Sequence, residues 1–90
     1  MNFEWDTAKA ASNLRKHGIS FDEAVTVFGD SQAVTFSDTD HSENEDRSRT
    51  YGMSSEGRLL VVVHTERPNK VRIINARKAT RYEQTIYIQG

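Results

Sequence analysis

The chain has 90 residues, with 12 Lys and Arg against 13 Asp and Glu for a net charge of −1, and it contains no cysteine. This length predicts a single domain, residues 1–90, with one small core, and the lack of cysteine excludes disulfide scaffolds, thiolate zinc sites and cysteine nucleophiles. The longest apolar run, residues 59–63, is too short to cross a bilayer and the N-terminus has no signal-peptide pattern, so we expect a soluble cytoplasmic protein.

The first predicted element is a helix over residues 7–17. Asp6 can cap its N-terminus, and Gly18 supplies the left-handed residue that ends it. Three polar residues recur on this helix at i, i+4 and i+7 and form a stripe, usually a solvated face: Lys9, Asn13 and Lys16. Histidine is the side-chain type whose ordinary pKa lies near neutrality, so His17, at the helix end, is a candidate proton donor or acceptor, although a cation there also stabilises the helix dipole without any catalytic role.

A second helix and a first strand follow. Ser20 and Glu23 have the spacing of a capping box, which predicts a helix over residues 21–28. Residues 33–36 read as a short strand. Residues 38–46 form an acidic stretch without helical periodicity, which we interpret as a loop. A cation could bind near His41 in this loop, but the regular ligand spacing of a metal site is missing.

The middle of the chain predicts an antiparallel meander. Strands are expected at residues 47–53, 58–66 and from residue 71, with turns at 54–57 and 67–70. On the central strand, His64 shares one face with Leu60, Val62 and Glu66, and is expected to be a partly buried sheet residue rather than a catalyst.

The last predicted element is a C-terminal helix. Thr80 and Glu83 form a second potential capping box, and Tyr82, Ile86 and Tyr87 can pack back on the sheet. The expected fold class is therefore α+β, with two N-terminal helices, an antiparallel sheet of about four strands and this C-terminal helix.

Charge is distributed unevenly along the chain. Residues 1–50 contain five Lys and Arg against ten Asp and Glu, a net charge of −5, while residues 51–90 contain seven against three, a net charge of +4. Four cations gather within ten residues at the last strand and helix start: Arg72, Arg77, Lys78 and Arg81. Such a group indicates an anionic ligand, or else a solvated basic edge that discourages strand aggregation.

Two arginines of this group are candidates for binding a phosphate. Arg77, at the strand end, is the first choice because its guanidinium fork matches phosphate geometry. Arg72 is second, because five residues apart on a regular strand the two side chains point to opposite faces. They share a site only if a bulge or strand end redirects one of them. Otherwise one arginine is structural and pairs with an acid of the first half.

A set of short motifs resembles the BrnT family of toxins from bacterial type II toxin-antitoxin systems. The segments that carry the resemblance are Phe3-Glu-Trp-Asp6, Lys16-His-Gly18, Ala24-Val-Thr-Val-Phe28, Leu59-Leu-Val-Val-Val63, Arg72-Ile-Ile, Ala76-Arg77 and the single residues Lys9, Asn13, Phe21, Asp30, Ala79 and Glu83. One departure is Asn75, where the family typically has serine. Trp5 can stack a base, though a tryptophan before a helix cap is more often a core anchor.

The resemblance implies a fold similar to RelE toxins, ribonuclease activity that arrests growth, and neutralisation by a DNA-binding BrnA-type antitoxin, through which alone operator DNA is contacted. The many Arg, Lys and His residues, beside the absence of an ordered set of carboxylate and histidine metal ligands, predict endoribonuclease action without a metal ion or cofactor. We expect the antitoxin to cover the basic strand end. The catalytic candidates are Arg77, Arg72, Lys16 and His17, and the candidate RNA contacts are Lys78, Arg81, Lys9 and Arg47. The rival interpretation is a non-catalytic module that docks an acidic protein or RNA through its basic strand end.

Overall fold

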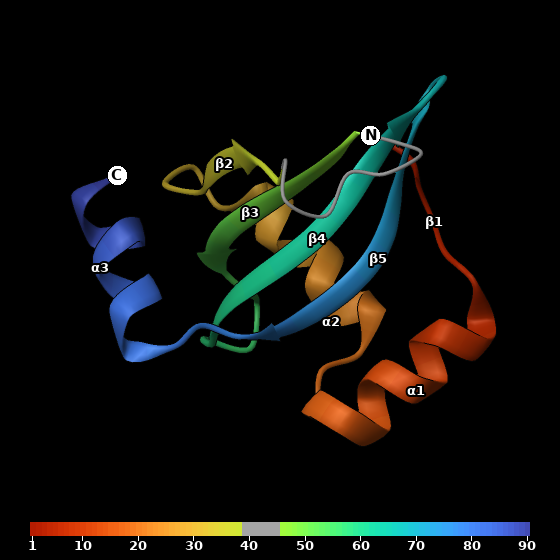
Figure 1. The fold of residues 1–90 in the computed structure, drawn as a ribbon, viewed down its shortest axis with the longest axis horizontal. Coiled ribbons are helices and arrows are strands. Elements are labelled where there is room, and N and C mark those ends of the chain that lie inside the picture. The colour runs from red at the N-terminus through yellow and green to blue at the C-terminus, as the bar shows by residue number, and fades with distance from the viewer. Residues whose placement is uncertain (39–45) are drawn as a thin grey trace.

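The computed structural model describes residues 1–38 and 46–90, which form one mixed sheet with three α-helices around it (Figure 1). In chain order the elements are β1 (Phe3–Glu4), α1 (Thr7–His17), α2 (Phe21–Val25), the 3-10 turn η1 (Thr26–Gly29), β2 (Val34–Ser37), β3 (Arg47–Met53), β4 (Leu59–Arg67), β5 (Lys70–Lys78) and α3 (Arg81–Gln89).

The strand order is β1-β5-β4-β3-β2. Neighbouring strands from β2 to β5 pair antiparallel, whereas β1 pairs parallel with β5, with Phe3 opposite Val71. The α+β class and the three helices are confirmed, but a purely antiparallel sheet of about four strands is wrong: within the described residues the sheet has five strands and is mixed. β1 escapes prediction because two residues are too few to show a strand's alternation.

The helix ends follow the capping pattern. Asp6 Oδ1 accepts hydrogen bonds from the backbone N–H of Ala8 and Lys9, at 2.8 and 3.0 Å, and Gly18 adopts a φ of 72° after the last turn of α1. The second helix is shorter than predicted because α2 gives way to η1, where consecutive β-branched residues, Val25 to Val27, disfavour a continued α-helix.

Helices α1 and α2 cover one face of the sheet and form the core with it (Figure 1). The largest fully buried side chains come from both layers: Ile19, Phe21, Val27, Leu60, Val62 and Ile73. Trp5 packs beside them with its ring 5.9 Å from that of Phe21 in an edge-on arrangement, so it is a core anchor in this fold.

His64 lies on the same core face and is fully buried rather than partly buried. Its Nε2 is 2.7 Å from Thr50 Oγ1, and its ring meets Phe28 edge-on with 4.9 Å between centroids. Burial lowers the pKa of His64, which favours the neutral ring. The expectation that His64 is a sheet residue is confirmed by this placement.

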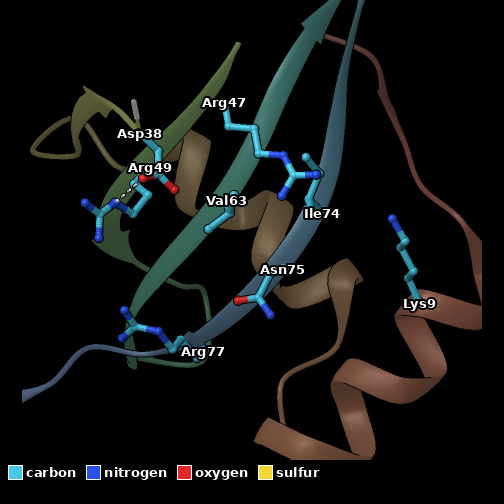
Figure 2. A pocket seen from close by; sticks show the side chains of 8 residues that line it. All are labelled: Lys9, Asp38, Arg47, Arg49, Val63, Ile74, Asn75 and Arg77. Carbon is cyan, nitrogen blue, oxygen red and sulfur yellow. Dashed lines mark ion pairs between the residues drawn. The ribbon is translucent and has the colours of Figure 1, made fainter. Parts of the chain in front are cut away.

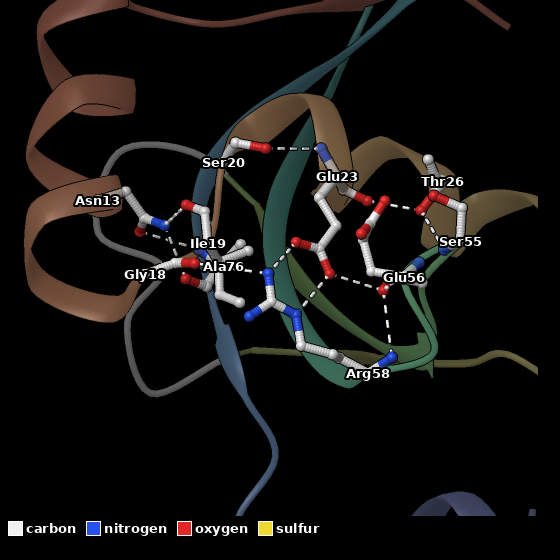
Figure 3. A network of polar contacts seen from close by, with 11 residues as sticks. Asn13, Gly18, Ile19, Ser20, Glu23, Thr26, Ser55, Glu56, Arg58 and Ala76 are labelled. Atoms are coloured by element: carbon white, nitrogen blue, oxygen red, sulfur yellow. Dashed lines mark hydrogen bonds and ion pairs between the residues drawn. The ribbon is translucent and has the colours of Figure 1, made fainter.

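A buried carboxylate ties α2 to the turn between β3 and β4 (Figure 3). Glu23 accepts hydrogen bonds from Ser54 Oγ at 2.7 Å and from Arg58 Nε at 3.0 Å, and Arg58 holds the pKa of Glu23 below its ordinary value. Ser20 caps α2 by accepting from the Glu23 backbone N–H. Because the Glu23 side chain is turned toward Arg58, the predicted capping box is only half formed.

The side chain of Asn13 makes hydrogen bonds to the edge of β5 of the kind that a neighbouring strand would make (Figure 3). Its amide nitrogen donates to the carbonyls of Ile19 and Ala76 at 2.8 Å each, and its oxygen accepts from the Ala76 backbone N–H at 3.1 Å. Asn13 is only 4% exposed. The interpretation of this residue as part of a solvated stripe is therefore wrong, because it satisfies backbone groups that the two-residue β1 is too short to reach.

No helix formed by residues 1–38 and 46–90 is long and apolar enough to span a membrane. The same residues contain no group of three His, Asp or Glu side chains arranged to hold a metal ion. His41, considered above as part of a cation-binding loop, lies outside the described residues.

Candidate functional site

The face of the sheet opposite the core carries most of its charged side chains. Its cross-strand rows are Arg47–Thr65–Arg72, Arg49–Val63–Asn75 and Tyr51–Val61–Arg77. Tyr51 and Val61 are buried at the end of this face toward α3, which contacts β3, whereas the other two rows include half-buried cations. The second face is therefore closed by α3 at one end and basic beyond it.

A bulge in β5 brings its two arginines to this same face. Val63 lies opposite Asn75 while His64 lies opposite Ile73, so Ile74 is an extra residue. Five residues on a regular strand reverse the side-chain direction, and one extra residue restores it. Arg72 and Arg77 thus share the second face, as the sequence required for a common site.

A cavity of about 440 Å³ opens between this face and the start of α1 (Figure 2). Four of its eight lining side chains are basic and one is acidic: Lys9, Arg47, Arg49, Arg77, Asp38, Val63, Ile74 and Asn75. Figure 2 shows that these side chains come from α1, from the segment after β2, and from β3, β4 and β5. The structure therefore brings together three residues that the sequence nominated, Lys9, Arg47 and Arg77.

Arg77 is held by a carboxylate of α3. Its Nη1 and Nη2 donate to the two carboxylate oxygens of Glu83 at 2.7 and 2.9 Å, and the Glu83 side chain also accepts from the backbone N–H of Thr80 in the predicted capping box. These bonds, the Arg77 pair first, lower the pKa of Glu83 to about 2 and raise that of Arg77. These two hydrogen bonds hold the guanidinium of Arg77 in one orientation on the cavity wall.

Asp38 supplies the one carboxylate among the lining residues. It is 4% exposed, its backbone N–H donates to the Arg47 carbonyl at 2.7 Å, and its Oδ1 lies 3.8 Å from Arg49 Nε. The sequence interpretation placed Asp38 in an acidic loop and gave no role to Arg49. Alternation along residues 47–51 could have identified Arg49, since it puts Arg47 and Arg49 on one face, but no local signal placed Asp38 beside them.

Arg72 lies on the same face of the sheet but pairs with Glu4 of β1. Its Nη1 donates to Glu4 Oε2 at 3.2 Å, and Lys70 Nζ lies 3.6 Å from the other oxygen of Glu4. The Arg72 hydrogen bond is the largest cause that lowers the pKa of Glu4. Arg72 is absent from the cavity lining and pairs with an acid of the first half, the structural arrangement that the sequence left open.

The remaining nominated residues lie outside the cavity. Lys16 lines a smaller neighbouring hollow of about 130 Å³ that shares Lys9, Ile74 and Asn75 with it. His17 is exposed at the end of α1. Lys78 lies opposite Leu60 on the core face, and its charge contributes to the lowered pKa of Glu23 in α2. Arg81 is exposed in the first turn of α3. The four cations that are close in sequence therefore do not form one patch.

These groups suit a phosphodiester ligand. Arginine and lysine bind phosphate oxygens, and a carboxylate beside them can accept a proton. The arrangement contains cationic groups that could stabilise an extra negative charge on phosphorus, with Asp38 in reach of the same space.

Comparison with known proteins agrees with this chemistry. Residues 5–83 match the family model described as the ribonuclease toxin BrnT of type II toxin-antitoxin systems. The crystal structure of the Brucella abortus ribonuclease toxin BrnT has a similar fold, with a TM-score of 0.69 and 20% sequence identity over 90% of this chain and 99% of that chain. No curated protein matches the chain.

Proposed function

We propose that this chain, which belongs to the BrnT family of ribonuclease toxins of type II toxin-antitoxin systems, is an endoribonuclease that cleaves RNA without a metal ion in the cavity on the second face of its sheet. The observation that supports this most directly is the lining of four cations around one carboxylate. In the cell this activity arrests growth in the cytoplasm, and a BrnA-type antitoxin that binds operator DNA restrains it.

The proposed reaction uses the ribose 2′-hydroxyl as the nucleophile. Asp38 takes the proton of the 2′-hydroxyl, the 2′-oxygen bonds to phosphorus, and the bond from phosphorus to the 5′-oxygen breaks. Arg77 and Arg47 stabilise the negative charge that develops on the phosphorane oxygens. Lys9, whose ammonium group lines the same cavity, gives a proton to the leaving 5′-oxygen. The products are a 2′,3′-cyclic phosphate and a free 5′-hydroxyl.

The other nominated residues have lesser parts in this proposal. Lys16 extends the phosphate contact along α1 through the neighbouring hollow, and Arg81 and Lys78 add positive charge at the strand end. His17 and Arg72 take no step in the reaction, because His17 lies at the exposed end of α1 and Arg72 is bound to Glu4.

One observation favours the alternative, a non-catalytic binding module. Arg77 is already paired with Glu83 through both of its terminal nitrogens, so part of its charge is neutralised before any ligand arrives. A binding module retains RNA or an acidic protein without changing it, and turnover separates the two functions.

The test is cleavage by the purified chain, freed of any partner, in the presence of EDTA. We expect RNA to be shortened and its new ends to carry 2′,3′-cyclic phosphates, because the lining residues supply a base, an acid and charge stabilisation without a metal. Mass spectrometry of the end groups and gel analysis of fragment length measure both. Activity that EDTA abolishes and magnesium restores would contradict the metal-independent reaction, and RNA that is bound at full length would support the binding module.

A further inference from the structure

Phe36 exposes an apolar ring beside the basic cavity. It lies on β2, the edge strand of the sheet, and remains 50% exposed, whereas its neighbour on the same face, Tyr51, is 4% exposed. An exposed aromatic side chain on a sheet edge adds a risk of strand aggregation. Half of this residue is therefore open to a ligand on the second face of the sheet.

The register fixes where the ring stands. Phe36 is directly opposite Arg49, and Asp38 lies two residues further along the same strand direction, so all three side chains belong to the second face. Arg49 and Asp38 line the cavity. Directly opposed side chains on antiparallel strands have Cβ atoms about 5 Å apart, so the ring borders the cavity at its β2 side.

A second aromatic ring constrains Phe36. The rings of Phe36 and Tyr51 are 5.9 Å apart with an interplanar angle of 77°, an edge-on contact. Since Tyr51 is buried, this contact restricts the movement of Phe36 while leaving half of the residue open to solvent. A ring held in this way loses little conformational freedom when a flat ligand stacks on it.

We propose that Phe36 is a stacking subsite for a nucleobase of single-stranded RNA whose phosphates occupy the adjacent cavity; this inference rests on the proposed function and specifies its substrate. Phosphates and bases alternate along a strand, and the structure offers the matching pair of surfaces, cations at Arg47 and Arg49 and an apolar ring beside them. Stacking requires a base that is not already stacked in a duplex, which selects single-stranded segments.

The surroundings of the ring favour RNA over a protein partner. A protein interface is centred on a contiguous apolar area that is depleted of charge. Here the exposed ring is bordered by Arg49 and Asp38, and the next aromatic residue, Tyr51, is already covered. A single ring next to cations is the arrangement by which single-stranded nucleic acid is bound without strict sequence preference.

The experiment measures binding separately from cleavage. The probe is a fluorescein-labelled single-stranded 2′-O-methyl oligonucleotide, which the proposed reaction cannot cleave because the nucleophile is blocked. We expect Phe36→Ala to weaken binding about five- to 150-fold, the range for loss of one base–aromatic stack, without changing the slope of log K against log salt. Phe36→Trp should restore binding. Arg47→Ala should instead reduce that slope by about 0.7, as loss of one phosphate contact requires.

Two further variants make the result specific. Phe36→Leu keeps apolar bulk but no aromatic face, and is expected to bind as weakly as Phe36→Ala. Ile88→Ala removes a more exposed apolar side chain on α3, 78% exposed against 50% for Phe36, and is expected to leave binding unchanged. Thermal unfolding confirms that each variant is folded.

The outcomes separate the two proposals. Wild-type affinity in Phe36→Ala and Phe36→Leu, or a change in salt slope rather than in affinity, overturns the stacking subsite while leaving the proposed ribonuclease intact. A wild-type chain that does not bind the oligonucleotide at any salt concentration also overturns the stacking subsite. Cleavage of ordinary RNA by the same wild-type preparation tests the proposed function on its own.

Discussion

Two arginines on one strand illustrate how neighbours decide the role of a side chain. Arg72 and Arg77 are the same residue type on the same face of β5, yet each is held by a different carboxylate. Arg72 pairs with Glu4 of β1 and does not line the cavity, whereas Arg77 pairs with Glu83 of α3 and does line it. An arginine paired with a carboxylate still has donors free for a phosphate, because the guanidinium carries five N–H groups.

Replacement of Arg77 tests its place in the reaction. We expect Arg77→Ala to lower the cleavage rate about a hundredfold to a thousandfold, the usual cost of removing one group that stabilises transition-state charge. Growth arrest on induction should disappear with it. The measurements are single-turnover cleavage and colony counts, with circular dichroism to show that the variant is folded.

Glu83→Gln and Arg72→Ala are the matched controls for this prediction. Glu83→Gln breaks the same ion pair as Arg77→Ala but keeps the cation, so it should retain most of the activity. Arg72→Ala removes a cation of the same face that is bound to Glu4, and its rate should stay within a few-fold of wild type. If Glu83→Gln lost as much activity as Arg77→Ala, the role of Arg77 would be to hold α3 rather than to contact phosphate.

At the residue scale, the sequence predicts side chains well where the reason is local. The caps at Asp6, Gly18 and Thr80 depend on three or four neighbouring residues and are all present. Asn13 was misjudged because its partner is distant in sequence: it bonds to Ala76, 63 residues away. Asp38 lies outside the strands as predicted, but its proximity to Arg49 of β3 was missed for the same reason. A polar residue with a remote partner looks the same in a sequence as one that faces water.

At the scale of elements, α3 is attached to the sheet at both of its ends. Its first turn is joined to β5 by the Arg77–Glu83 pair, and near its last turn Tyr87 donates its hydroxyl hydrogen to Asp30 Oδ2 at 2.7 Å. Asp30 also accepts from the backbone N–H of Met53 on β3, the largest cause that lowers its pKa. Two carboxylates therefore hold a helix that has little buried apolar surface of its own, since Tyr82 and Ile88 are exposed.

This attachment makes the stability of the domain depend on acid. The pKa of Glu83 is about 2 in the fold against an ordinary value of 4.5. Between these values the unfolded chain binds more protons than the folded one, so the free energy of unfolding falls as pH is lowered from about 4.5 to about 2. We expect Glu83→Gln to be less stable at neutral pH and to lose less stability over this range. Urea unfolding at a series of pH values measures both quantities.

Glu56→Gln is the control for the acid dependence. Glu56 is exposed in the turn between β3 and β4, so this variant should keep the wild-type profile. Glu23 and Asp30 also have lowered pKa values, and their share of the acid dependence should remain in Glu83→Gln. A wild-type slope in Glu83→Gln would show that the Arg77 pair does not stabilise the folded chain relative to the unfolded one.

Elements with a repeated pattern were predicted closely, and those without one were not. β3 has the predicted bounds, 47–53, and β4 is shifted by a single residue at each end. β1 has no period that two residues could display, and the bulge at Ile74 leaves no mark in a run of apolar and polar residues. The bulge decides which face Arg77 occupies, so the cavity itself was beyond prediction even though three of its cations were nominated.

At the scale of the whole molecule, the acidic and basic halves of the sequence are interleaved in space. Acids of the first half, Glu4 and Glu23, pair with Arg72 and Arg58 of the second half. The pairing neutralises much of the basic excess that the sequence shows and leaves positive charge at the cavity and at the strand end beside α3. A partner that recognises this chain by charge therefore has a limited area to use.

The last prediction concerns the antitoxin that we propose as the partner. If it covers the strand end next to the cavity, complementary charge should speed its association, and salt should lower the association rate more than it raises the dissociation rate.

Charge reversal by Lys78→Glu together with Arg81→Glu should slow association and flatten its salt dependence, since both side chains are exposed there. Stopped-flow mixing of toxin and antitoxin at several salt concentrations measures these rates. Arg15→Glu together with Lys70→Glu gives the same change in net charge on exposed positions in α1 and at the first residue of β5, and should alter the rate far less. Equal effects of the two pairs would mean that the antitoxin responds only to net charge, and no effect of the first pair would place the contact surface away from the strand end.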